Sequence, residues 1–175
     1  MQLQKSLLTA TLLLAVSSLT VANAAPITSD SFDVLLKVDQ TCTVVTGATA
    51  DIGLGTVAAG QAQLVGSEKT GSTIITTNCS VGSSAKITLQ PVSSKSTDGT
   101  GKLKGSGPTA GQEIAYKLTS VSSAGPAWGT VTPVTTAAAT NYATGIATTV
   151  YATVTDTADV IPGDYLDTVN VSVTF

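Results

Sequence analysis

The side chains of this 175-residue chain that could do chemistry are hydroxyls, carboxylates, two thiols and one indole, because the sequence contains no histidine. Ser and Thr hydroxyls are abundant, but the commonest general base and metal ligand is missing. Asp156, Asp159, Asp164 and Asp167 could supply a carboxylate pair or a calcium site. Their spacing matches no calcium loop, and Asp164 and Asp167 flank a turn, where aspartate is common. The residues therefore predict no enzyme, no cofactor and no bound metal.

The two thiols and the single indole have structural interpretations as well as chemical ones. Cys42 and Cys79 could be free thiols or half of a metal site, but an even pair in a secreted chain indicates one disulfide. Trp128 could stack on a sugar, although a single tryptophan more often packs in a core or a loop. We expect a Cys42–Cys79 disulfide and a packed Trp128.

The first residues have the pattern of a secretory signal peptide. Lys5 precedes an apolar run over residues 7–21, and Ala22 and Ala24 place small residues before a cleavage site. A transmembrane anchor is the alternative, but the run is short, rich in Ser and Thr, and followed by no basic cluster. We expect residues 1–24 to be removed and the chain to leave the cytoplasm.

The composition also limits the possible partners. The formal net charge is −3, and all eight basic residues are lysines. A mildly acidic chain without arginine lacks the electrostatic footprint of a nucleic-acid binder and suits an anionic membrane surface equally poorly. Thr, Ser, Ala, Val and Gly dominate, and these residues favour strands and tight turns over helices. We expect an all-β fold with no nucleic-acid partner.

Alternating apolar residues and turn signals predict one disulfide-bonded β-sandwich of immunoglobulin-like type. Strands are expected over residues 41–45, 72–80, 85–91, 113–119, 143–154 and 164–175, with a weak strand around Leu103. The strands at 72–80 and 85–91 are expected to pair as a hairpin, and residues 164–175 are interpreted as one strand. The glycine-punctuated stretch 51–60 is predicted to be a bulged strand, because neither a helix nor a Lys-Ser/Thr pair follows to bind phosphate.

A further strand is predicted ahead of the first cysteine. Its apolar face consists of Phe32, Val34, Leu36 and Val38, which alternate with Asp33, Leu35, Lys37 and Asp39. Such a period of two is typical of a strand with one buried face. A strand at a chain terminus need not pair with its own domain. We therefore expect residues 25–40 to form an extension and residues 41–175 to form the domain.

Several motifs resemble the spore coat protein U domain family, which includes the pilins of the archaic, or alternate, chaperone–usher pathway. The motifs are Thr-Cys-Thr-Val at 41–44, Ile-Gly-Leu-Gly at 52–55, Thr-Thr-Asn-Cys at 76–79, Trp-Gly at 128–129 and Pro-Gly-Asp-Tyr-Leu-Asp-Thr at 162–168, continuing to Phe175. The resemblance covers nearly all of the predicted mature chain, but residues 93–140 diverge. It implies an incomplete immunoglobulin-like sandwich that lacks its last strand.

The resemblance also implies a mechanism of assembly. A periplasmic chaperone lends a strand to the gap, and at an outer-membrane usher the N-terminal extension of the next subunit replaces it. The donor side chains would be Phe32, Val34, Leu36 and Val38. The strand beside the acceptor groove, which also binds the chaperone, would carry Val169, Val171, Val173 and Phe175, whose carboxylate would be the chaperone's anchor.

The function expected from these patterns is that of a structural subunit of a surface pilus, serving adhesion or biofilm formation. Its partners would be neighbouring pilus subunits, the chaperone and the usher. One alternative is a secreted spore-coat or matrix protein of the same fold, whose N-terminal strand pairs within its own domain. Another is a carbohydrate-binding module that uses Trp128.

Overall fold

The computed structural model describes residues 30–46, 51–64 and 66–175. The chain divides into two units, Met1–Lys37 and Val38–Phe175. Only residues 30–37 of the first unit are described, so the predicted signal peptide at residues 1–24 and the start of the extension at 25–29 lie outside the described residues. The prediction of a separate N-terminal extension remains a prediction.

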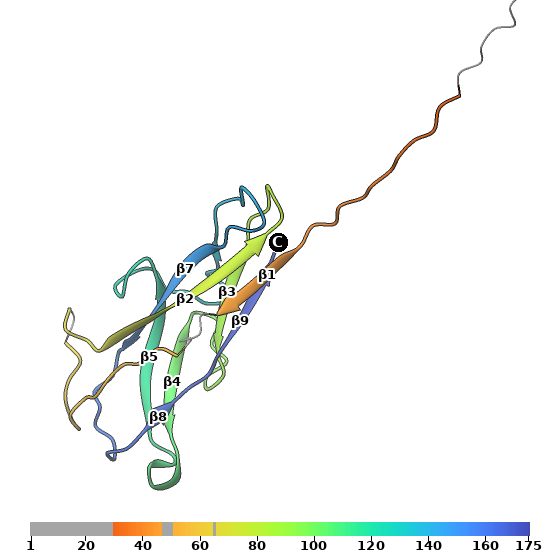
Figure 1. Ribbon diagram of the computed structural model, residues 1–175. Coiled ribbons are helices and arrows are strands. Elements are labelled where there is room, and N and C mark those ends of the chain that lie inside the picture. The colour runs from red at the N-terminus through yellow and green to blue at the C-terminus, as the bar shows by residue number, and fades with distance from the viewer. Residues whose placement is uncertain (1–29, 47–50, 65) are drawn as a thin grey trace, which may run out of the picture. The chain divides into compact units, whose positions relative to one another are not determined.

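The second unit is an antiparallel β-sandwich, as predicted (Figure 1). Its elements in chain order are β1 (Cys42–Thr46), β2 (Thr70–Cys79), β3 (Lys86–Pro91), β4 (Thr100–Gly105), the 3₁₀ turn η1 (Gly107–Thr109), β5 (Glu113–Ser120), β6 (Val134–Thr135), β7 (Ile146–Val154), β8 (Tyr165–Leu166) and β9 (Val169–Thr174). One sheet has the order β1-β2-β7-β5-β4-β8, and the other has the order β6-β3-β9. Within the described ranges, no helix is both long and apolar enough to cross a membrane.

The core lies between the two sheets and follows the predicted alternation. On β5, Ile114, Tyr116 and Leu118 are buried on one face. The buried cluster consists of Ile75, Cys79, Ala85, Ile87, Leu89, Tyr116, Leu118, Trp128, Ala139, Val150 and Ala152. The predicted disulfide joins Cys42 to Cys79 and thereby ties β1 to β2. The fold class and the disulfide are confirmed.

The predicted hairpin between residues 72–80 and 85–91 is wrong. β2 pairs with β1 and β7 in the six-stranded sheet, whereas β3 pairs with β6 and β9 in the other. The turn after β2 contains Gly82 at φ 81°, and the chain there crosses between the layers. Both strands bury an apolar face, so each finds non-local partners in its own sheet.

Two further strand predictions need correction. Residues 51–60 form no strand, although Ile52 and Leu54 do pack against the core as expected. The stretch 164–175 is not one strand, because β8 pairs with β4 in one sheet and β9 pairs with β3 in the other. The break falls at Asp167 and Thr168, where side-chain hydrogen bonds hold the chain between the sheets.

The loop between β3 and β4 contributes a pH-dependent term to stability. The Asp98 carboxylate accepts hydrogen bonds from the hydroxyls of Ser96 and Thr100 and from the Thr100 amide. These bonds lower the pKa of Asp98 from 3.8 to about 2. A depressed pKa stabilises the fold above the unfolded value, and this contribution is lost as the pH falls towards 2.

We therefore expect Asp98→Asn to flatten part of the acid dependence of stability. Between pH 4 and pH 2 the free energy of unfolding should fall more steeply in the wild type than in the variant. Urea titrations at several pH values in this window measure both curves. Equal slopes for the two proteins would contradict the role given to Asp98.

Candidate functional site

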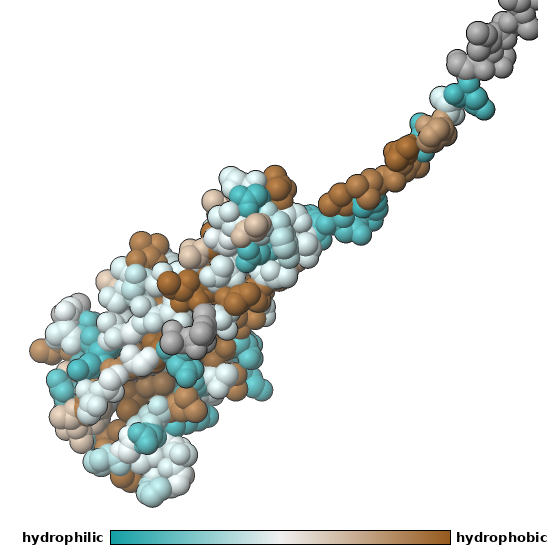
Figure 2. Space-filling model, in the orientation of Figure 1, coloured by the Kyte–Doolittle hydropathy of each residue, from teal (hydrophilic) through white to brown (hydrophobic). Residues whose placement is uncertain are grey.

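The predicted donor segment presents its apolar side chains to solvent. Phe32, Val34, Leu36 and Val38 are between 81% and 88% exposed, and Leu35, on the opposite face of the alternation, is 88% exposed. Residues 30–41 are assigned to no strand. Figure 2 shows this segment as a run of brown, apolar atoms beside teal, hydrophilic ones. So large a run of exposed apolar side chains is typical of a surface that binds a partner.

The predicted acceptor strand is an edge strand. β9 pairs with β3 along its whole length, and no strand in the described part of the chain pairs with its second edge. Its register places Val169, Val171 and Val173 opposite Pro91, Leu89 and Ile87, which are buried. Because directly paired residues share a face of the sheet, these three valines point inward. They contact the core but are only partly buried.

β1 forms the corresponding edge of the other sheet. It pairs only with β2 among the described strands, and Val44 lies opposite the fully buried Thr77. The Val44 side chain therefore faces inward, yet it is 42% exposed. Inward-facing side chains are thus incompletely covered on both border strands.

The two border strands lie close together without forming a ladder. β1 and β9 are neighbours in space, and Figure 1 shows them side by side. We call their border the β1–β9 seam, formed by Cys42–Thr46 on one side and Val169–Thr174 on the other. An edge with unpaired backbone groups and partly exposed core side chains is suited to receive another strand. The seam contains three of the four predicted acceptor residues, and Phe175 follows β9 directly and is 55% exposed.

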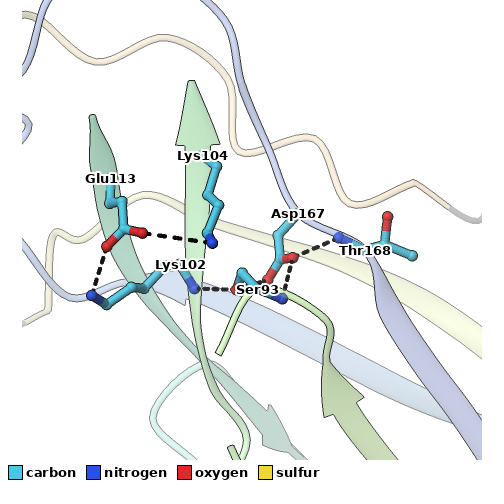
Figure 3. Close-up of polar contacts among 6 residues, drawn as sticks. All are labelled: Ser93, Lys102, Lys104, Glu113, Asp167 and Thr168. Carbon is cyan, nitrogen blue, oxygen red and sulfur yellow. Dashed lines mark hydrogen bonds and ion pairs between the residues drawn. The ribbon is translucent and has the colours of Figure 1, made fainter. Parts of the chain in front are cut away.

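Asp167 has a structural role beyond the turn position that the sequence indicated. Its carboxylate accepts hydrogen bonds from Ser93, as Figure 3 shows, and from Tyr116. It lies where the chain leaves one sheet for the other. Tyr116 is 3% exposed, and burial together with the bond to Asp167 raises the pKa of its phenol. The sequence did contain a signal for this role. Asp167 occupies an inward position in an alternation that is otherwise apolar, and a carboxylate at such a position needs hydrogen-bond partners.

A second polar cluster lies on the exposed surface of β4 and β5. Lys102 Nζ lies 2.6 Å from Glu113 Oε2, and Lys104 Nζ lies 3.7 Å from Oε1 (Figure 3). The hydrogen bond from Lys102 lowers the pKa of Glu113, and the same bond raises the pKa of Lys102. Ion pairs this exposed contribute little to stability. The cluster therefore indicates a solvated ion pair and no reaction.

The other candidate residues do not assemble into a reactive or sugar-binding site. Trp128 is completely buried and its Nε1–H donates to the Ile87 carbonyl oxygen, so the indole has no face to offer to a sugar. Residues 30–46, 51–64 and 66–175 contain no group of three or more His, Cys, Asp and Glu side chains arranged to hold a metal ion. The features that remain as a candidate site are the predicted donor segment, residues 31–39, and the β1–β9 seam.

Comparisons with known proteins agree with this architecture. The family model described as "Spore Coat Protein U domain" matches residues 28–172. No match was found among curated proteins. Among solved structures, the chain resembles one in the complex of CsuC and CsuE, a chaperone–tip adhesion subunit pre-assembly complex from the archaic chaperone–usher Csu pili of Acinetobacter baumannii. The TM-score is 0.54 at 18% identity, and the match covers 79% of this chain but 40% of that one, so the likeness is one of fold.

Proposed function

The chain belongs to the spore coat protein U domain family, and from that premise we propose that it is a structural subunit of a surface pilus. In this proposal residues 31–39 of one subunit insert at the β1–β9 seam of the next, as an added strand. A periplasmic chaperone occupies the seam before assembly, and an outer-membrane usher exchanges it for the donor segment. The subunit passes through the periplasm and ends in a fimbrium on the cell surface, where it serves adhesion or biofilm formation.

The observation that carries the proposal is that one chain has two apolar surfaces that are incompletely buried. The donor segment has an apolar face that is almost fully exposed, and the seam has inward-facing valines that are only partly buried. Burying four large apolar side chains contributes about 6–12 kcal/mol before the costs of ordering. A gain of this size is comparable with the stability of a whole domain, about 5–15 kcal/mol. An exchanged strand would therefore be held firmly.

The dimensions of the two features also match. A strand rises about 3.3 Å per residue, so residues 31–39 extend over about 30 Å. The six residues of β9 extend over about 20 Å by the same rise. The donor segment is long enough to pair with the whole free edge of β9. Donor and acceptor are different segments of each subunit, so the contact is head-to-tail, which produces an open filament when the rotation between subunits does not close into a ring.

The two alternative functions lack such an observation. A coat or matrix protein of the same fold would pair residues 32–38 within its own domain, and the described residues 30–41 form no strand. A sugar-binding module built on Trp128 would need an accessible indole, and this one is buried.

Deletion of residues 25–39 tests the proposal. In a strain that carries the cognate chaperone and usher, the truncated subunit should reach the periplasm but form no fibres, because it has no strand to donate. Electron microscopy with subunit-specific antibody labelling of surface material measures fibre formation. The matched control removes residues 25–29 alone and should still assemble. Fibres built from the subunit that lacks residues 25–39 would refute the proposal.

A further inference from the structure

We infer that Asp167 is the positioning residue of the seam: its carboxylate holds the crossover between the sheets and so makes β9 an edge strand in a fixed register. The use of that edge by a donor strand rests on the proposed function, whereas the positioning itself does not. We call Asp167 with Ser93, Tyr116 and Thr168 the Asp167 clasp.

The clasp joins the crossover to both sheets through one carboxylate. Oδ1 accepts from the Ser93 amide at 3.0 Å and from the Thr168 amide at 2.8 Å. Oδ2 accepts from the Ser93 hydroxyl at 2.5 Å and from the Tyr116 hydroxyl at 2.7 Å. Hydrogen bonds to a charged acceptor are roughly twice as strong as neutral ones, so four such bonds strongly favour one position of this carboxylate.

The partners of Asp167 come from both layers. Tyr116 belongs to β5 of the six-stranded sheet, and Ser93 follows β3 of the three-stranded sheet. The Ser93 hydroxyl oxygen also accepts from the Lys102 amide of β4 at 2.9 Å (Figure 3). The neighbouring Val92 amide donates to the Thr168 carbonyl oxygen at 2.8 Å. The crossover is thus tied to β3, β4 and β5 at a single point.

Gly101 makes room for the phenol that completes the clasp. A Cβ atom at Gly101 would lie 2.3 Å from Cζ of Tyr116 and 2.5 Å from its hydroxyl oxygen. Real Cβ atoms do not approach other atoms so closely, so the ring lies directly against the β4 backbone. A larger residue at position 101 would displace the ring and with it the hydroxyl that donates to Asp167.

The clasp acts against the local preference of the chain. The alternation would place four residues on the same face of one continuous strand: Tyr165, Asp167, Val169 and Val171. The local pattern alone therefore favours a single strand that continues from β8. Such a strand would stay in the sheet of β4 and would remove β9 from β3. The tertiary hydrogen bonds of Asp167 override that preference. Their loss should therefore affect the seam first and the rest of the core much less.

Hydrogen exchange of the full mature chain, in its monomeric fraction, tests this inference. In Asp167→Ala, exchange of the amides in residues 169–174 and 86–91 should accelerate about tenfold or more, because hydrogen bonds to a charged group are lost. The amides of β2 and β7 should keep their wild-type protection. Asp164→Ala removes an exposed carboxylate three residues earlier and serves as the matched control, with no change at residues 169–174.

Two milder variants keep the test decisive if Asp167→Ala fails to fold. Asp167→Asn keeps the acceptor for the two amides, so its exchange should lie between wild type and alanine. Tyr116→Phe removes one bond and should accelerate exchange at residues 169–174 by roughly threefold to tenfold. Wild-type exchange at residues 169–174 in both milder variants would overturn the inference.

Capture of a synthetic peptide of residues 31–39 separates this inference from the proposed function. Wild type and Asp164→Ala should take up the peptide, and Asp167→Ala and Tyr116→Phe should take it up more slowly. A wild type that captures no peptide would contradict strand donation. Equal capture by all variants, with accelerated exchange at β9, would contradict the use of this edge by the donor strand and would leave the positioning of β9 by the Asp167 clasp supported.

Discussion

Leu36→Asp should abolish fibre formation while leaving the subunit folded. Leu36 is 87% exposed and is not a member of the buried core cluster, so its replacement removes no core side chain. In the proposed fibre the same position faces the core of the next subunit. Burying a carboxylate there without a partner would weaken the association by several kcal/mol. The loss of the buried leucine would add about 1.5–3 kcal/mol. The measurement is the yield of fibres on cells, relative to the amount of subunit in the periplasm.

Leu35→Asp provides the matched control for this prediction. It makes the same substitution with the same charge change one residue earlier, at a side chain that is equally exposed. Successive residues of a strand point to opposite faces, so position 35 would face outward in the added strand. We expect Leu35→Asp to retain most of the wild-type fibre yield. Equal yields for the two variants would contradict the assignment of the donor face.

Trp128→Ala should destabilise the isolated domain more than other single substitutions in its loop. Trp128 is the single tryptophan of the sequence and is completely buried, with its Nε1–H donating to the Ile87 carbonyl oxygen at 3.0 Å. Its amide also donates to the Leu118 carbonyl oxygen. Removing a buried tryptophan typically costs about 3–5 kcal/mol, a large part of the stability of a single domain. Denaturant titrations followed by circular dichroism measure the free energy of unfolding.

Val131→Ala is the control for the tryptophan prediction. Val131 follows three residues later and is 66% exposed, so its truncation should change the free energy of unfolding by less than about 0.5 kcal/mol. Trp128→Phe retains an aromatic ring but loses the hydrogen bond, and should fall between the two. A Trp128→Ala domain as stable as wild type would contradict the role of the indole as a core residue.

The sequence predicted those parts of the fold that depend on local alternation. β5 and β7 lie close to their predicted positions, because a strand with one buried face repeats every two residues. The disulfide was predicted from the presence of two cysteines in a chain with a predicted signal peptide. Sheet membership was not predicted, because it depends on non-local pairing. β2 and β3 are neighbours in sequence, yet each pairs in a different layer.

The site was predicted in part. The alternation predicted a strand that contains Val169, Val171 and Val173, and the family resemblance implied that this strand borders an acceptor groove. β9 is an edge strand, and its role as an acceptor stays a proposal. The break at Asp167 was missed because the alternation of inward-facing residues runs unbroken from Tyr165 to Val169. The exposure of the inward-facing Val44 side chain could not be predicted either, because it depends on which strands lie beside β1. The roles of the donor residues remain proposals.

A three-dimensional reconstruction of the fibre by electron cryomicroscopy tests the central claim most directly. The account predicts that residues 31–39 of each subunit form a strand hydrogen-bonded to the free edge of β9 in the neighbouring subunit, with Phe32, Val34, Leu36 and Val38 pointing into its core. A fibre in which residues 31–39 pair within their own subunit, or in which β9 of the neighbour keeps an open edge, would contradict it.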